Sequence, residues 1–392
     1  LMLENYLKKK NEAISPEEMA QVIAFLPPPE PEEKRADLPI ETQTNLPGSR
    51  KKGTPYLLQL PPEYRHSRAY PVLLLLHQAG QKPGPIFQVF RSLAARYGYI
   101  LVAPEWEQTL SNTYEYSVEE HEGVLDVLRD LLRRFQVDTD RVFLLGFGEG
   151  GNMAFDVGLG HPDLFAGILT VSGRPRFHAI RNWQNGQYLP FYVVEGELSD
   201  DISKQNRAQF KEWVPRGYPA IHVQYKGRGY EWFDAELPVM FEWMEHKRGQ
   251  FRRARAFPEL GRSFGGPFGE EFRSMRACDN RFYWLSTDGI HERNLNDPHR
   301  WYNQRTPAKF QGRISEGNQI SVNVDGIKQL SIWLARDMID FDRPVTVRIN
   351  GRMTHWSNRK VSASMSTLLE DFYRRGDRQR LFVARLDFDR PS

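Results

Sequence analysis

The sequence predicts an α/β fold in which a mostly parallel β-sheet is flanked by helices, and three observations support this prediction. Between residues 53 and 248, short apolar runs alternate with longer helical patterns. The runs are almost free of polar residues, as at residues 72–76, which is typical of parallel strands covered on both faces. A glycine-rich turn at residues 146–151 joins one apolar run to a helical pattern. A helical sequence precedes this region, and a β-rich sequence follows it.

Composition excludes several classes of protein. The 392 residues are enough for two or three domains of about 100–200 residues each. The 53 Lys and Arg residues nearly balance the 50 Asp and Glu residues, so the net charge of +3 gives no basic surface for nucleic acid. No apolar run approaches about 18 residues, so no transmembrane segment is expected. The single cysteine, Cys278, excludes an intrachain disulfide and a cysteine-based zinc cluster.

Residues 1–26 are predicted to form a helical N-terminal segment. Ser15 and Glu18 are spaced as a capping box at the start of a helix. Residues 27–52 are predicted to form a Pro-rich linker, because proline holds the chain extended and offers no backbone donor. The chain begins at Leu1 rather than at a methionine, and we therefore expect an upstream domain that this chain lacks.

Residues 53–248 are predicted to form the α/β domain, in which each strand is followed by a helix or a loop. Its strands are expected at residues 55–60, 70–76, 99–102, 141–145, 166–171, 190–194 and 220–225. Its helices are expected at residues 86–97, 117–135, 150–158, 202–213 and 235–247.

Residues 249–280 are rich in Gly, Arg and Phe, and they are predicted to form a connector. Residues 281–392 are predicted to form a β-rich C-terminal module, because turn signals such as Asn350-Gly351 separate short apolar runs. Its strands are expected at residues 320–324, 330–334, 345–349 and 381–386, with one helix at residues 364–375.

The strongest local signal lies at residues 142–151, where an apolar strand leads through a glycine turn into a helix. Gly146, Gly148 and Gly150 occupy the three fixed positions of Gly-x-Ser-x-Gly, the strained turn that lifts a catalytic serine above the sheet. The segment therefore resembles the nucleophile elbow of the α/β-hydrolase superfamily. The branch that it resembles comprises esterases, prolyl-oligopeptidase-like proteins and polyhydroxybutyrate-depolymerase-like proteins.

The resemblance covers about half of the chain and extends to other parts of the hydrolase site. Residues 70–80 resemble the strand that ends in His-Gly-x-Gly and donates an oxyanion-hole amide, here that of Ala79. Residues 194–197 resemble the start of the loop that carries the catalytic acid, and residues 226–233 resemble the Gly-x-Gly-His-Glu-x-Phe loop that carries the catalytic histidine. The resemblance thus implies a serine hydrolase with its nucleophile, acid and base in this order.

The sequence departs from that pattern at the positions that carry chemistry. The serine position is Gly148, the histidine position is Tyr230, and the first glycine of the oxyanion motif is Gln78. The acid is retained as Asp200 or Asp201, and the sequence does not decide between them. Glycine offers no nucleophile, and a tyrosine with an ordinary pKa near 10 is a poor general base at neutral pH.

We therefore interpret the chain as a catalytically silent hydrolase-fold protein, a pseudo-esterase or pseudo-peptidase that acts by binding or scaffolding. Its ligand would be a small molecule or a protein. A vestigial pocket is expected to involve Gln78, Ala79, Glu149 and Trp232, with the amides of Glu149 and Ala79 holding an anionic or carbonyl group. The opposite expectation is that Tyr230 and Gln78 fill the pocket.

Two other functions stay open. The first is an active esterase or peptidase of the serine-hydrolase family with a rearranged site. The second is a nucleotide-binding protein, because residues 146–151 also match Gly-x-Gly-x-x-Gly. That fingerprint requires a carboxylate about 20 residues later, at the end of the next strand, where this sequence has Arg174.

No other residue pattern supplies the missing chemistry. Cys278 lies outside the hydrolase-like segment, and neither Ser172 nor Ser199 sits on a glycine-flanked turn. The 10 histidines show no spacing typical of metal ligands. We therefore expect no cofactor and no bound metal.

Overall fold

The computed structural model divides into two compact units. The larger is built from residues 29–253 and 296–305, and the smaller from residues 1–28, 254–295 and 306–392. The residues that the structure describes are 14–29, 38–46, 53–106, 113–247, 271–389 and 391. Residues 1–13 of the N-terminal segment, part of the predicted linker and most of the predicted connector lie outside them. Within the described ranges, no helix has the length and apolar character needed to cross a membrane.

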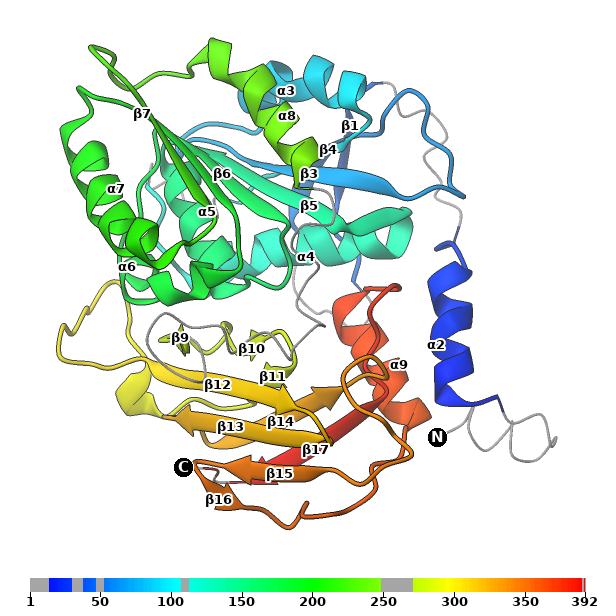
Figure 1. Cartoon of the computed structure of the whole chain (residues 1–392). Helices are drawn as coiled ribbons and strands as arrows, with labels where there is room; N and C mark the ends of the chain where they lie inside the picture. The colour runs from blue at the N-terminus through cyan, green and yellow to red at the C-terminus, as the bar shows by residue number, and fades with distance from the viewer. Residues whose placement is uncertain are drawn as a thin grey trace. The chain divides into compact units, whose positions relative to one another are not determined.

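The larger unit contains an eight-stranded sheet with the order β1-β2-β4-β3-β5-β6-β7-β8 (Figure 1). β2 runs antiparallel to its neighbours β1 and β4, and the strands from β4 through β3 to β8 are parallel to one another. The predicted mostly parallel sheet is therefore confirmed. The strands are β1 (Ile40–Gln43), β2 (Pro55–Gln59), β3 (Tyr70–Leu76), β4 (Ile100–Pro104), β5 (Val137–Phe147), β6 (Gly167–Val171), β7 (Phe191–Gly196) and β8 (Ala220–Tyr225).

β1 lies in residues that were assigned from the sequence to the Pro-rich linker. It pairs with β2 at the edge of the sheet, with Ile40 opposite Leu58 and Gln43 opposite Pro55. An edge strand is only half covered, so it needs few apolar residues, and β1 has one in four positions. The apolar run that predicts the other strands is therefore missing here.

Helices cover both faces of this sheet, α3 and α8 on one face and α4, α5 and α7 on the other (Figure 1). α4 begins with a capping box between Ser117 and Glu120, which explains its sharp start. The helices are α3 (Gly84–Tyr97), α4 (Val118–Arg134), α5 (Glu149–Gly160), α6 (His178–Arg181), α7 (Asp200–Trp213) and α8 (Leu237–His246), with 3-10 turns at Trp183–Gln187, Val214–Arg216 and Asp234–Glu236.

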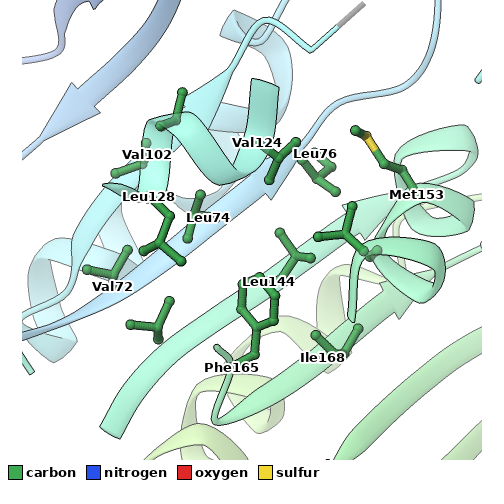
Figure 2. Packing of buried hydrophobic residues seen from close by; sticks show 14 of the residues in the cluster. Val72, Leu74, Leu76, Val102, Val124, Leu128, Leu144, Met153, Phe165 and Ile168 are labelled. Carbon is green, nitrogen blue, oxygen red and sulfur yellow. The ribbon is translucent and has the colours of Figure 1, made fainter. Parts of the chain in front are cut away.

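The two helical layers explain the uninterrupted apolar runs of the central strands. In β3, Leu74 and Leu76 point to one face and pack with Val124 and Leu144 (Figure 2). Leu73 and Leu75, which alternate with them along the strand, point to the other face and join the core beneath α3 and α8. Every residue of β3 is buried, because both faces of the strand are covered.

The glycines of the turn between β5 and α5 allow the backbone to pack closely. A Cβ atom at Gly146 would lie 2.0 Å from the carbonyl oxygen of Gly150, and one at Gly150 would lie 2.1 Å from that of Leu76. A Cβ atom at Gly151 would lie 2.8 Å from the Cα of Gly173. The glycines therefore let α5 start directly against β3 and the end of β6.

The smaller unit is rich in β-strands, with sheets ordered β10-β11-β14-β17 and β16-β15-β13-β12-β9. Phe282 of the first sheet packs against Phe272 and Phe310 of the second, with ring centroids 5.3 and 5.2 Å apart. The strands are β9 (Phe272–Ser274), β10 (Arg281–Phe282), β11 (Leu285–Ser286), β12 (Ala308–Ser315), β13 (Gln319–Asp325), β14 (Gln329–Leu334), β15 (Thr346–Ile349), β16 (Arg352–Met353) and β17 (Ala384–Asp389).

Among its described residues, the smaller unit has the helices α2 (Pro16–Phe25) and α9 (Met365–Arg375) and a 3-10 turn at Glu292–Asn294. α2 has the capping box expected from Ser15 and Glu18. Its Ile23 packs with Leu368 of α9 in a small apolar cluster. β9 lies in residues that were assigned from the sequence to the connector, and it forms one edge of the five-stranded sheet.

The close packing of the glycine turn gives a stability prediction. Gly146→Ala is expected to lower the free energy of unfolding by about 1–3 kcal/mol, because its Cβ would meet backbone atoms that cannot move aside independently. The measurement is urea denaturation followed by circular dichroism. The control is Gly229→Ala, whose Cβ would meet nothing within 4 Å, and which should change stability by no more than about 0.5 kcal/mol. Equal effects of the two substitutions would contradict the packing argument.

Candidate functional site

A cavity of about 440 Å³ opens at the carboxyl edge of the eight-stranded sheet. Loops that follow β3, β5, β6, β7 and β8 form its walls, and this edge is where parallel α/β sheets bind ligands. Its lining residues are Gln78, Gly148, Glu149, Asn152, Ser172, Arg174, Leu198, Ser199, Asp200, Asp201, Ile202 and Tyr230.

The structure brings together most of the residues singled out from the sequence. Gln78, Gly148, Glu149, Asp200, Asp201 and Tyr230 all line the cavity. Ala79 and Trp232 do not. Ala79 is buried in the core, and Trp232 stacks on Phe147 with the ring centroids 3.9 Å apart.

Gly148 has the backbone of an elbow but no room for a side chain. Its φ and ψ are 58° and −119°, its N–H donates to the carbonyl of Val171 at 2.9 Å, and its carbonyl accepts from the N–H of Asn152 at 3.0 Å. A Cβ atom built at Gly148 would lie 1.8 Å from Gln78 Oε1 and 1.8 Å from the Tyr230 hydroxyl. The space next to Gly148 is therefore occupied by the ends of two other side chains.

Gln78 accepts two hydrogen bonds at the elbow. Its Oε1 atom accepts from the Glu149 N–H at 3.0 Å and from the Tyr230 hydroxyl at 2.6 Å. A backbone N–H can only donate, so the atom facing Glu149 must be the amide oxygen. Gln78 thus occupies the Glu149 N–H, one of the two amides that were expected to hold an anionic or carbonyl group. The other amide atom, Nε2, makes no hydrogen bond within the described residues.

Tyr230 serves as a hydrogen-bond donor in this arrangement. Burial of its hydroxyl end and the neighbouring Glu149 carboxylate raise the pKa of Tyr230 to about 12. The phenol therefore keeps its proton at neutral pH and donates it to Gln78. The residue as a whole is 50% exposed, and its ring centroid lies 5.1 Å from that of Phe147. Tyr230 is therefore not a general base under ordinary conditions.

The two candidate acids lie in the first turn of α7, and both are exposed. Asp201 lies 3.2 Å from the guanidinium of Arg174. In the described part of the chain, the Asp200 carboxylate makes no ion pair, and neither aspartate bonds to Tyr230. The acid and base positions of the hydrolase pattern are therefore not connected.

A buried carboxylate near the cavity was not singled out as a site residue from the sequence. Glu195, at the end of β7, is fully buried. It accepts hydrogen bonds from Asn206 at 2.6 Å and Gln224 at 3.0 Å, and lies 3.0 Å from His222 Nε2. Burial alone would raise the pKa of Glu195, but the neighbouring His222 ring and the hydrogen bond from Asn206 outweigh it and lower the pKa.

The Glu195 network positions the helix that borders the cavity. Asn206 lies on α7 and also donates to the carbonyl of Gly173 at 2.9 Å, next to the cavity residues Ser172 and Arg174. Glu195 therefore joins β7, β8 and α7. Its sequence signal is a carboxylate directly after the apolar residues of a strand, where a charge must find partners.

Other groups with chemical potential lie in or near the cavity. Ser172 is buried with a φ of 52°, and its hydroxyl donates to the carbonyl of Glu231 at 3.2 Å. The Ser199 hydroxyl has no hydrogen-bond partner among the described residues. No described histidine lines the cavity. His77, for example, is buried and stacks on Trp106 with the ring centroids 5.0 Å apart.

Comparisons with known proteins match parts of this chain. A family model described as Chlorophyllase matches residues 35–172. Poly(3-hydroxybutyrate) depolymerase of Ralstonia pickettii is 31% identical over 97 residues, or 22% of this chain and 20% of that protein. NocK of Nocardia uniformis subsp. tsuyamanensis is 44% identical over 48 residues, or 12% of this chain and 14% of that protein. The matches thus span a fifth or less of either relative.

A solved structure of a ferulic acid esterase is 16% identical to the chain, with a TM-score of 0.45. The match covers 54% of this chain and 98% of that one.

The Glu195 network predicts a pH-dependent stability. Glu195→Gln should lower the free energy of unfolding by about 2 kcal/mol at pH 7, because a buried amide cannot accept from all the donors around it. The folded-state pKa of Glu195 lies below the ordinary value of 4.5, so the carboxylate stabilises the fold above that value. The difference between wild type and variant should shrink as the pH falls below it.

Urea denaturation at several pH values measures this difference, and Glu242→Gln is the control because Glu242 is exposed. A destabilisation by Glu195→Gln that stays constant down to low pH would contradict the assignment.

Proposed function

We propose that this chain, which belongs to the α/β-hydrolase superfamily, does not hydrolyse esters or peptides and acts by binding a ligand in the cavity beside Gly148. One observation carries the proposal. The position of the nucleophile has no side chain, and the space for one is taken by Gln78 Oε1 and the Tyr230 hydroxyl, each 1.8 Å from a Cβ built there.

The chemistry of the site supports the absence of hydrolysis. A serine-type mechanism needs a nucleophile, a base that takes its proton, and donors that stabilise the oxyanion. Gly148 supplies no nucleophile, Tyr230 holds its own proton, and the Glu149 N–H is bonded to Gln78. Enzymes that lose triad members keep only about 10³–10⁴-fold catalysis over water, and this remainder depends on the oxyanion hole. Here one donor of that hole, the Glu149 N–H, is already bonded to Gln78.

Ligand binding is supported by the space that remains. Gln78 and Tyr230 fill only the end of the cavity next to Gly148, and a volume of about 440 Å³ stays open beside them. Small-molecule sites have volumes of about 300–1,000 Å³. The geometry does not support the anion expected at the amides of Glu149 and Ala79, because Gln78 occupies the first amide and Ala79 lies outside the cavity lining.

An active hydrolase with a rearranged site is the second candidate function. One observation favours it: Ser172 and Ser199 line the same cavity as Asp200 and Asp201, and Ser172 has a strained backbone. This site would lack a histidine base among the described residues. The candidate therefore predicts turnover that Ser172→Ala or Ser199→Ala abolishes.

We do not propose nucleotide binding. The close packing of Gly146 and Gly151 and the positive φ of Gly148 account for the glycine spacing without a phosphate. The helix start that would bind a phosphate carries the Glu149 carboxylate, and its N–H is bonded to Gln78. Both features oppose an anion at this position.

Restoring the hydrolase residues tests the proposal. Wild type and Gly148→Ser/Tyr230→His should both lack turnover of p-nitrophenyl acetate, because Gln78 still collides with the new serine and occupies the Glu149 N–H. Adding Gln78→Gly to the double variant should raise turnover at least about tenfold above that of the matched control described below. A tenfold rise corresponds to about 1.4 kcal/mol of transition-state stabilisation.

The matched control combines Gln78→Gly and Tyr230→His with Gly148→Ala, which gives the same opened site without a nucleophile. Steady-state release of nitrophenolate is the readout. Wild-type turnover that Tyr230→Phe or Ser172→Ala abolishes would contradict the proposal and favour the rearranged hydrolase.

A further inference from the structure

We propose that Gln78 determines which ligands the cavity accepts. Its amide oxygen occupies the Glu149 N–H, so the hydrogen-bond donor that a ligand meets at the elbow is Gln78 Nε2 instead. The cavity would then bind an uncharged carbonyl compound with a short apolar substituent. This inference rests on the proposed function, since it names the ligand class of the same cavity.

The first step is the orientation of the Gln78 amide. Its oxygen is fixed by the Glu149 N–H and the Tyr230 hydroxyl at 3.0 and 2.6 Å. The Nε2 atom lies on the other branch of the planar amide and carries two N–H donors, and it makes no hydrogen bond among the described residues. Because Gln78 lines the cavity, these donors are available to a ligand there.

The second step is the strength of that donor. An amide whose oxygen accepts hydrogen bonds is polarised, and hydrogen bonds in a chain strengthen one another. Gln78 accepts two, one of them from a phenol that keeps its proton. Its Nε2 is therefore polarised as a donor, and a carbonyl oxygen is the matching acceptor.

The third step is charge. The lining contains the carboxylates of Glu149, Asp200 and Asp201 against the single guanidinium of Arg174, which Asp201 already pairs at 3.2 Å. A carboxylate or phosphate ligand would meet net repulsion. An ammonium ligand has no lone pair to accept from Gln78 Nε2. An uncharged ligand with a carbonyl oxygen avoids the repulsion and can accept a hydrogen bond from Gln78 Nε2.

The fourth step is the apolar part of the lining. Leu198 is 65% exposed and Tyr230 is 50% exposed, and with Ile202 they add apolar surface to a largely polar site. A short alkyl or aryl group on the ligand would cover this surface and gain about 25 cal/mol for each Å² removed from water.

Three probes of matched size test the inference: butyramide, butyrate and butylammonium. They are titrated into the ¹⁵N-labelled full chain, and the side-chain amide signals of Gln78 are assigned by their loss in Gln78→Glu. Butyramide should shift these signals saturably and leave the Glu149 backbone amide in place. Butyrate and butylammonium should cause no saturable shift.

Gln78→Glu is the sharper variant, because it keeps acceptors for Glu149 and Tyr230 and replaces the donor to the ligand with a carboxylate oxygen. It should weaken butyramide binding at least about tenfold, read from the Tyr230 and Leu198 signals. Gln78→Met, which removes donor and acceptor, should weaken binding as much and also shift the Glu149 amide. Equal affinity in wild type and Gln78→Glu, tighter binding of butyrate, or no saturable shift at Gln78 would overturn the inference.

The same spectra separate this inference from the proposed function. Conversion of butyramide to butyrate would appear in the free-ligand signals and would overturn the non-hydrolytic function, whatever happens at Gln78. Stable butyramide without a shift at Gln78 would overturn only the ligand class.

Discussion

The backbone turn at Gly148 is the constraint on which the larger unit depends. It takes the chain from β5 into α5 within one residue, at a φ of 58° and a ψ of −119°. A residue with a side chain in such a conformation carries about 1–3 kcal/mol of strain, and glycine carries much less. The turn also sets the distance between α5 and β3, so Gly146 and Gly150 are required by packing. The fold thus keeps the geometry of a nucleophile elbow without the strain that a nucleophile would impose.

Three residues that are far apart in the sequence depend on one another at this turn. Gln78 and Tyr230 fit only because residue 148 has no side chain, and Gln78 is held only because Glu149 and Tyr230 both donate to it. The result is an ordered polar contact rather than a collapsed site. It leaves an open cavity whose polar groups differ from those of a hydrolase, which is why binding and not turnover is proposed here.

Much of this arrangement follows from the sequence, and the rest depends on tertiary contacts. Strands buried on both faces, such as β3, are predicted by their apolar runs. β1 escapes prediction because an edge strand needs few apolar residues, and β12 because two of its buried positions are Ala308 and Gly312, whose side chains give little apolar signal. Residues 78, 148 and 230 are identified by resemblance one at a time. Their contact joins loops 152 residues apart, and no local pattern encodes it. The burial of Glu195 depends in the same way on α7 and β8.

The mutual fit at Gly148 also has a genetic consequence. A single change that introduced serine at position 148 would place its Cβ 1.8 Å from two side-chain atoms, and single changes at 78 or 230 would remove a hydrogen bond without creating a nucleophile. Each single change toward a triad therefore creates a clash or removes a hydrogen bond, and none by itself completes the triad. Substitutions at the three positions are therefore expected to be non-additive, because each one changes the contacts of the other two.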